Sequence, residues 1–263
     1  MGRKTTIDLG CDMGEAYGNW QLGSTDDAKL MTMISSAHIA AGFHAGDPNL
    51  MDRSVALALS NKVAIGVHPG FRDLQGFGRR RIVQSTEEMV NDIVYQVGAL
   101  REFVHLHAGT VQHVKPHGAL YMELAANEVA SRAFVKMMRR VAPDAFIYCM
   151  GASETYRIAK ELGQPVVREF YADREYDSTG KIVFTRKPDN YNPKSAADRV
   201  VRACLEGKVK PVDGPEIEVG FESICVHSDT PGSVDLLVAI REALGANGVE
   251  ILAPGAARAR NAT

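Results

Sequence analysis

The sequence predicts an α/β protein made of repeated strand–helix units. Three observations predict this fold class. Short runs of β-branched and aromatic residues alternate with longer runs whose apolar residues recur at helical spacing. Polar residues capable of chemistry follow nearly every short run. The chain has 263 residues, 45% of them hydrophobic, and no long linker or tandem repeat divides it. We therefore expect a single domain over residues 1–263, with its core at about 5–253.

Seven short runs are typical of β-strands because they are rich in Val, Ile, Phe and Tyr and end at Gly, Pro or polar residues. Their spacing leaves room for a helix after most of them, which favours parallel strands joined by crossover helices. The expected strands are 5–10, 38–43, 62–68, 111–116, 145–150, 165–171 and 223–227.

The clearest helix is expected between the third and fourth strands. Ser85 and Glu88 form a capping box at its start, and its valines and isoleucine share one apolar face. Gly109 can end it. Two further helix starts are expected at Asp47-Pro48 and Thr230-Pro231, where a capping side chain precedes a proline.

Two segments interrupt the strand–helix rhythm. Residues 174–186 and 209–219 have the alternating pattern of β-hairpins. Gly180 and the pair Asp213-Gly214 supply the turn residues. We therefore expect two β-hairpin insertions in the α/β domain.

Composition excludes several function classes. The net charge of -2 gives no bulk electrostatic reason to bind nucleic acid or an anionic membrane, so a small molecule or another protein is the expected partner. The four cysteines form no C-x-x-C pair, which argues against a zinc ribbon or a disulfide framework. No signal peptide or membrane-spanning run is evident. These features predict a cytoplasmic protein.

Polar residues gather just after the expected strands. In a parallel barrel or an open α/β sheet, the loops at the carboxyl ends of the strands surround the ligand site. Imidazoles and carboxylates aimed at one point are what proton transfer or metal binding requires. The residues in these loops are Asp12, Glu15, His44, Asp47, His68, Lys115, His117, Glu169, Asp173, Arg174, His227 and Asp229.

Other polar segments carry weaker signals. The run Arg79 to Arg81 follows two glycines and could clamp a carboxylate or phosphate, whereas a basic run is more often solvated surface. His105, His107 and His113 match no zinc spacing, and we expect them at the surface. The sequence has no phosphate-binding loop, dinucleotide fingerprint or nucleophile elbow, so it shows no standard ATP site of its own.

Six segments occur in an order that resembles the LamB/YcsF family: DLGCDMGEAYG, AAGFHAGDP, GVHPGFRDLQGFGRR, VKPHGALY, EFYADREY and ICVHSDTPGSV. The resemblance runs from about residue 6 to about residue 253. Bacterial members of that family include the A subunit of the ATP-dependent 5-oxoprolinase. The resemblance implies a single seven-stranded parallel β/α barrel related to polysaccharide deacetylases. It also implies opening of a cyclic amide, driven by ATP through two other 5-oxoprolinase-type subunits.

The chain departs from the family pattern near these same segments. Gly10 and His38 stand where the family usually has asparagine, and Ala41 replaces a cysteine. Gly70, Phe71 and Arg72 alter the segment after His68, and Ser228 replaces a glycine. A different lactam or a related cyclic amide would fit these changes.

Three hypotheses follow for function. The first is ATP-dependent opening of a lactam, 5-oxoproline to glutamate, as the hydrolytic subunit of a multi-subunit 5-oxoprolinase. Asp12 would be the base, and Lys115 and His117 would polarise the carbonyl or stabilise a phosphorylated intermediate. His44 and His68 would orient water or donate the proton. The expected substrate-binding residues are Glu15, Asp47, Arg79, Glu169, Asp173, Arg174, His227 and Asp229.

The second hypothesis is a metal-dependent deacetylase or amidohydrolase, in which Asp12, His44 and His68 bind a divalent metal. The third is a scaffold or ligand-binding subunit without chemistry of its own. Under the first hypothesis ATP acts through the partner subunits, and the two hairpins are the segments expected to face them. Self-association into a homo-oligomer stays open at this point.

Overall fold

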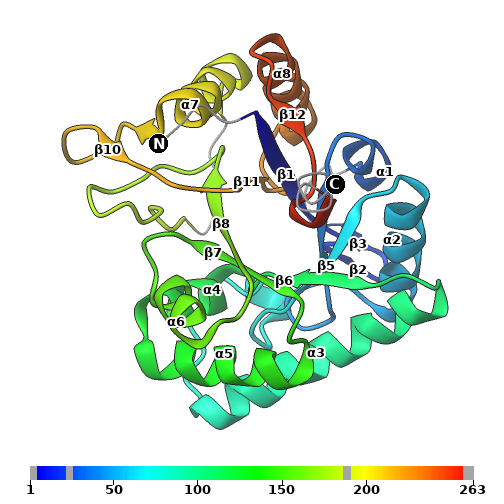
Figure 1. Cartoon of the computed structure of the whole chain (residues 1–263). Helices are drawn as coiled ribbons and strands as arrows, with labels where there is room; N and C mark the ends of the chain where they lie inside the picture. Colours follow the sequence, from blue (N-terminus) through cyan, green and yellow to red (C-terminus); the bar gives the residue numbers. More distant parts are fainter. Residues whose placement is uncertain (1–4, 22–25, 186–190, 257–263) are drawn as a thin grey trace.

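The structure is a computed structural model that describes residues 5–21, 26–185 and 191–256 (Figure 1). Seven parallel strands pair in sequence order, and the last pairs back to the first, which closes a barrel. The predicted seven-stranded β/α barrel is confirmed. The strands are β1 (Thr6–Met13), β4 (Ser36–Ala40), β5 (Ala64–His68), β6 (Val111–Val114), β7 (Phe146–Met150), β8 (Val166–Tyr171) and β11 (Ser223–Val226).

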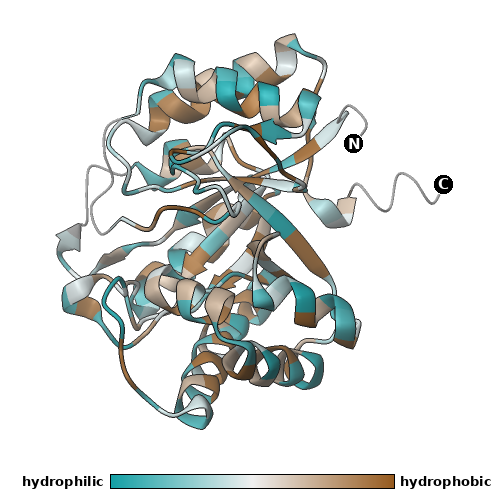
Figure 2. Ribbon diagram, turned by 90° about the vertical axis from the view of Figure 1, so that its left-hand side faces the viewer, coloured by the Kyte–Doolittle hydropathy of each residue, from teal (hydrophilic) through white to brown (hydrophobic). Residues whose placement is uncertain are grey.

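Helices surround this barrel. Each carries both hydrophobic and hydrophilic residues (Figure 2), as expected of helices with one face on a sheet. Among the described residues, none of them is both long enough and apolar enough to cross a membrane. They are α1 (Asp27–Met31), α2 (Pro48–Ser60), α3 (Thr86–Leu106), α4 (Gly118–Ala126), α5 (Glu128–Val141), α6 (Glu154–Leu162), α7 (Pro193–Glu206) and α8 (Ser233–Ala246), with a 3-10 turn at Leu74–Gly76.

Two of the predicted helix starts are confirmed, whereas one predicted start and one predicted end are wrong. Asp47 caps α2 through hydrogen bonds from the amides of Asn49 and Leu50, and the capping box at the start of α3 is present. The start expected at Thr230-Pro231 is wrong, because α8 begins at Ser233, two residues later, after Gly232. Gly109 does not end α3 itself: the helix stops at Leu106, and Ala108 takes the left-handed conformation.

Both expected hairpins are present in short form. Tyr176 pairs with Ile182 across a turn in which Gly180 has a φ of +80°. The second hairpin pairs β9 (Lys208–Val209) with β10 (Ile217–Glu218). Hydrogen bonds from Ser178 to Asp213 join the two hairpins, which lie beside β8 (Figure 1).

The sequence did not predict three of the short strands. β2 (Ala16–Tyr17) and β3 (Trp20–Gln21) form a hairpin after β1. β12 (Glu250–Ile251) pairs in parallel with the first residues of β1. Each has two residues, too few for a periodic pattern to be visible in sequence.

The sheet has an apolar outer face and a polar interior. Successive strand residues point to opposite faces, so Ile7, Leu9 and Cys11 of β1 pack under the helices. The alternate residues Asp8 and Asp12 point into the barrel. The lower interior is closed by Asp8, which accepts hydrogen bonds from Ser35, Ser36, Tyr148 and Ser223. Side chains therefore fill the lower barrel, and the groups capable of chemistry gather toward the carboxyl ends of the strands.

Candidate active site

Lys115 lies at the centre of the upper barrel, where β6 ends. It is 2% exposed, and its ammonium donates to Asp12 Oδ1 at 2.6 Å and to Cys225 Sγ at 2.9 Å. Burial alone would lower the pKa of Lys115, but nearby negative groups, led by Asp12, raise it well above its usual value. Lys115 is therefore a fixed buried cation.

Asp12 is the counter-ion of Lys115. Burial alone would raise the pKa of Asp12, but His68 and Lys115 together lower it well below the usual range. Its second oxygen, Oδ2, lies 3.3 Å from His68 Nε2 and 3.8 Å from His227 Nε2. A carboxylate held this firmly in its ionised form is a strong electrostatic anchor and a weak proton acceptor.

His68 and His117 form a pair that must contain a positive charge. His68 Nδ1 lies 2.6 Å from the carbonyl oxygen of Lys115, and His117 Nε2 lies 2.8 Å from that of Phe77. Both nitrogens must donate, because a carbonyl only accepts. In the neutral rings, His68 Nε2 and His117 Nδ1 would then both be lone-pair acceptors. They lie 2.9 Å apart, so a proton or another cation must sit between them.

Glu15 and His44 both contact the His68–His117 pair. Glu15 Oε1 lies 3.1 Å from His44 Nε2 and 3.3 Å from His117 Nδ1. Burial alone would raise the pKa of Glu15, but its hydrogen bonds with His117 and His44 lower it, so the carboxyl is ionised. The ring of His44 stacks on His117 with centroids 3.7 Å apart. His44 is fully buried and acts on His117 rather than on the cavity.

His227 and Asp173 form an oriented dyad. Asp173 Oδ1 lies 2.9 Å from His227 Nδ1, so that nitrogen carries the proton. The other ring nitrogen, Nε2, faces Asp12 Oδ2 at 3.8 Å. Thr230 also donates to Asp173, and Arg174 lies 3.1 Å from it. Burial alone would raise the pKa of Asp173, but Arg174 and His227 lower it far below the usual range.

A small cavity connects these groups. It is lined by residues from several strand ends and from the first hairpin: Asp12, His68, Arg79, Lys115, Pro116, His117, Gly118, Tyr121, Met122, Tyr171, Arg174, Ile182, Phe184, Thr185 and His227. The space in it that the centres of water molecules can reach is about 30 Å³, so the cavity is narrow. Arg79 lies at its rim, paired with Asp229 at 2.8 Å.

Comparisons with known proteins agree with this architecture. Residues 7–259 match the LamB/YcsF family. The chain belongs to the LamB/YcsF family. A relative from Pseudomonas aeruginosa, named as a 5-oxoprolinase A subunit, is 55% identical over 250 residues, which is 95% of this chain and 99% of the relative. Another from Natranaerobius thermophilus, also named as a 5-oxoprolinase A subunit, is 41% identical over 95% of this chain and 97% of its own.

Solved structures show the same fold. The crystal structure of the lactam utilization protein from Thermus thermophilus has a TM-score of 0.87 and 36% identity, and it covers 94% of this chain and 99% of its own. A family 4 carbohydrate esterase from Streptomyces lividans is 10% identical with a TM-score of 0.50, over 95% of this chain and 93% of that one. The second likeness concerns the fold alone.

The structure brings most of the sequence-predicted residues of this LamB/YcsF protein to one end of the barrel. Asp47 does not join them, because it caps α2 and accepts from the backbone of Gly18. Glu169 lies below Lys115, 3.4 Å from it. The predicted residues that line the cavity, or contact a residue that lines it, are Asp12, Glu15, His44, His68, Arg79, Lys115, His117, Glu169, Asp173, Arg174, His227 and Asp229.

Sequence reasoning missed several residues of this region. Tyr121 and Tyr171 line the cavity and donate to Glu169 Oε2. The expectation that His113 lies at the surface is wrong, because His113 is fully buried inside the barrel. A period of two from Lys115 back to His113 puts both on the same face of β6, and this signal was available in the sequence.

Departures from the family pattern lie around the same groups. A Cβ at Gly10 would be 2.4 Å from His38 Nε2, and one at Gly70 would be 2.5 Å from His44 Nδ1. Ser228 donates to Glu15 Oε2 at 3.4 Å. Arg72 bonds Asp92 at the surface and does not enter the cavity. Three of these four changes therefore touch residues that surround the site.

The fit of a metal ion can be tested on this geometry. Among the described residues, ligand atoms gather in two groups: Glu15, His44, His68 and His117, and separately Asp12, His38 and Cys225. The predicted set of Asp12, His44 and His68 is divided between them. The Lys115 ammonium already contacts Asp12 and Cys225 in the second group.

The first group fits a metal only in part. His44 and His117 stack at an interplanar angle of 4°, so their in-plane lone pairs run parallel and cannot both point at one ion. Glu15, His68 and His117 remain. The last two donate their other ring nitrogens to backbone carbonyls, as metal-binding histidines do.

Proposed function

We propose that this chain is the hydrolytic subunit of an ATP-dependent enzyme that opens a lactam, with 5-oxoproline as the substrate and glutamate as the product. The observation that carries the proposal is the cavity in which the Lys115–Asp12 pair meets His68, His117 and His227. Relatives named as 5-oxoprolinase A subunits, at 41% to 55% identity over most of the chain, supply the substrate class.

The chemistry requires one water to be added across the C–N bond, with the hydroxyl going to carbon and the hydrogen to nitrogen. His227 is the best-placed base, because Asp173 fixes its proton on Nδ1 and leaves Nε2 open to a water beside Asp12. This revises the role expected for Asp12, whose pKa is too low for efficient proton abstraction. Asp12 instead orients that water and holds Lys115.

The remaining groups stabilise charge and supply a proton. Lys115 is placed to stabilise the negative charge that develops on the carbonyl oxygen. The proton shared by His68 and His117 is available to the nitrogen as the ring opens. Arg79 and Arg174, which line the cavity, are candidates to bind the substrate carboxylate.

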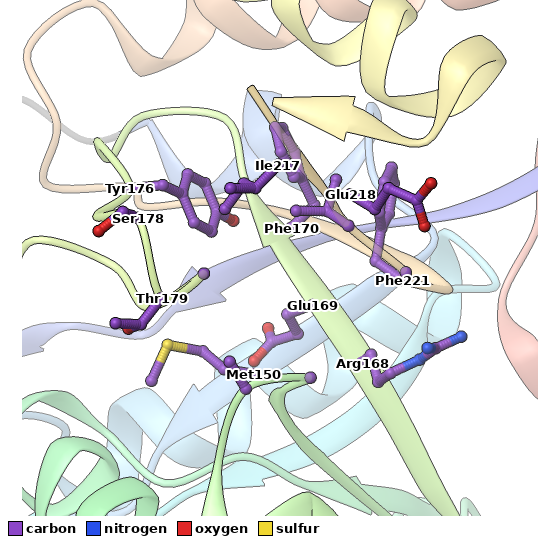
Figure 3. Close-up of a pocket in the computed structure, with 15 residues that line it drawn as sticks. Met150, Arg168, Glu169, Phe170, Tyr176, Ser178, Thr179, Ile217, Glu218 and Phe221 are labelled. Atoms are coloured by element: carbon purple, nitrogen blue, oxygen red, sulfur yellow. The ribbon is translucent and has the colours of Figure 1, made fainter. Parts of the chain in front are cut away.

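ATP would act through two partner subunits, because the sequence has no phosphate-binding loop. The word subunit in the names of the relatives supports a multi-subunit assembly. Both hairpins line a second cavity of about 410 Å³ beside β8, with Tyr176, Ser178, Thr179, Ile217 and Glu218 on their side (Figure 3). We propose this side of the barrel as the face toward a partner.

The test is an assay of lactam consumption and ATP hydrolysis. The purified chain alone should leave 5-oxoproline unchanged, and addition of the two partner subunits should produce glutamate with ATP consumed. His227→Asn should abolish glutamate formation by the assembled enzyme, whereas Asp47→Asn, a change outside the cavity, should not. Efficient hydrolysis by the chain alone without ATP would overturn the proposal.

A metal-dependent amidohydrolase is the second candidate function. The observation that favours it is the 2.9 Å approach of two lone-pair nitrogens in His68 and His117, which a divalent ion held with Glu15 would also explain. Such an ion would lower the pKa of a bound water. Metal analysis of the purified chain tests this candidate. One tightly held ion that is lost in His117→Ala would support it, and the absence of a bound ion would exclude it.

A further inference from the structure

Two imidazoles fill the middle of the barrel, below the site already described. His38 on β4 and His113 on β6 are fully buried, and Gly66 of β5 lies in register between them. A Cβ at Gly10 would be 2.4 Å from His38, and a Cβ at Gly66 would be 2.0 Å from His113. Neither glycine has a left-handed backbone, so backbone conformation does not require glycine at these positions. Glycine is needed because a Cβ would overlap the imidazole rings.

The hydrogen-bond chain through these rings fixes their tautomers. His113 Nδ1 lies 2.6 Å from Gln112 Oε1, an acceptor, so Nδ1 carries the proton of that ring. Burial lowers the pKa of His113 to about 3, so its Nε2 is a lone-pair acceptor. His38 Nδ1, 2.7 Å away, must donate to it. His38 Nε2 is therefore left as a buried acceptor without a hydrogen bond.

The unpaired nitrogen faces Glu169. Glu169 Oε1 is 4.0 Å from His38 Nε2 and 3.4 Å from the Lys115 ammonium, and like His38 Nε2 it is buried without a well-aligned hydrogen bond. The other oxygen, Oε2, accepts from the phenols of Tyr171 at 3.0 Å and Tyr121 at 3.3 Å. A proton on Glu169 therefore belongs on Oε1. A shift of about 1 Å in the carboxyl group would bring Oε1 and Nε2 to hydrogen-bond distance.

We propose that His38 Nε2 accepts a hydrogen bond from a protonated Oε1 of Glu169, so that Glu169 stands under Lys115 as a neutral acid. This gives a hydrogen bond to two buried polar atoms that otherwise make none, His38 Nε2 and the Oε1 atom that lies beside Lys115, and buried polar atoms without hydrogen bonds are rare in native proteins. His38 is a positioning residue, because it acts on Glu169 and does not reach the cavity. His113 and Gln112 hold it in the accepting tautomer.

Other groups around Glu169 agree with a neutral carboxyl. Burial raises the pKa of Glu169, against the opposing effect of Lys115, and the Asp12 carboxylate raises it further. Glu169 leaves β8 on the face opposite Arg168, which pairs with Glu222 and does not reach the carboxyl (Figure 3). The titratable groups that face or interact with Glu169 or His38 include Asp12, His68, His113, Lys115, Tyr121, Tyr148, Cys149, Tyr171, Tyr176 and Cys225.

The consequence for the reaction rests on the proposed function. As Lys115 gives a proton to the substrate oxygen, the O–H bond of Glu169 breaks and a new N–H bond forms on Lys115, 3.4 Å away. Lys115 keeps its charge, and Glu169 becomes a carboxylate. When the C–N bond breaks and the C=O bond re-forms, the proton on the substrate oxygen returns through Lys115 to Glu169, while the proton of the attacking water goes to His227. No oxidant or further reactant is needed.

The test reads the Glu169 carboxyl directly. In protein labelled with ¹³C at the glutamate side-chain carboxyl, Glu169→Gln assigns the resonance, which is then followed from pH 5 to pH 9 without substrate. We expect the protonated position at pH 7. His38→Gln keeps an amide near the place of Nε2 and should preserve that state. His38→Asn reaches only the place of Nδ1 and should lower the apparent pKa of Glu169 by about one unit or more.

Two results would overturn the inference. A wild-type resonance at the carboxylate position at pH 7 would show that Glu169 is ionised, and this measurement does not depend on any His38 variant folding. A titration in folded His38→Asn equal to that of the wild type would reduce His38 to a packing residue. Because the titration uses no substrate, it stands whether or not the chain opens lactams. Absence of lactam opening with the expected titration would refute only the proposed function.

Discussion

Asp12→Asn tests the buried ion pair at the heart of the site. Asparagine nearly preserves the volume of aspartate, and on volume alone we would expect little loss of stability. The structure reverses that expectation. The substitution leaves the Lys115 ammonium, 2% exposed, without the carboxylate that it contacts at 2.6 Å. Removal of one partner from a buried pair costs about 3–5 kcal/mol in the free energy of unfolding.

The assay combines stability and turnover. Urea unfolding at pH 7 should show the loss of about 3–5 kcal/mol, and the melting temperature should fall by roughly 6–20 °C for a chain of this size. Glutamate formation by the enzyme assembled with its partners should fall about a hundredfold or more, because the water and Lys115 both lose their anchor.

Glu169→Gln is the matched control, since it removes the other carboxyl beside Lys115, at 3.4 Å. If Glu169 is already neutral, the amide is its isostere, and the free energy of unfolding should change by less than about 1 kcal/mol. The reasoning would be refuted if Asp12→Asn unfolded within about 1 kcal/mol of the wild type, or if Glu169→Gln cost as much as Asp12→Asn.

Three further predictions follow from single contacts. Gly10→Ala should lower the free energy of unfolding by about 1–3 kcal/mol, because its Cβ would overlap His38, whereas Gly98→Ala on open helix surface should raise it by about 0.5–1 kcal/mol in the same urea titration. Arg79→Met should raise KM for 5-oxoproline roughly 10–100-fold and leave KM for 2-pyrrolidinone, which lacks the carboxylate, unchanged. The free energy of unfolding should begin to fall as the pH drops below about 6.5, because His113 has a pKa of about 3 in the folded protein and the unfolded chain therefore binds the extra proton. Each pH unit between about 6.5 and 3 should lower the free energy of unfolding by about 1.4 kcal/mol. His113→Gln should remove this effect.

The sequence predicted the barrel strands well because each has a β-rich composition, and all except 145–150 have a polar residue capable of chemistry at the end. All seven expected strands overlap a strand of the closed barrel. The helix start at Asp47-Pro48 was predictable because its signal is local. At Thr230-Pro231 the same signal failed, because the Thr230 hydroxyl donates to Asp173, which follows the neighbouring strand β8, and the chain continues as a turn to Gly232.

The site was predictable as a set of residues but not as a set of roles. Position at strand ends identified Asp12, His68, Lys115 and His227, since parallel strands bring those ends together. Roles depend on which atom faces which, and the sequence contains no such information. Asp12 became a counter-ion because Lys115 lies 2.6 Å away, a contact between residues 103 positions apart.

Charge balance ties the inferred protonation states to each other. Four carboxylates lie near the cavity: Asp12, Glu15, Asp173 and Asp229. Three fixed cations balance three of these negative charges: Arg79, Lys115 and Arg174. One shared proton on the His68–His117 pair supplies the fourth positive charge, provided that Glu169 is neutral. A divalent ion in place of that proton would add one charge too many for a buried site. Ionisation of Glu169 would restore the balance, so the metal content and the Glu169 titration should be measured on the same preparation.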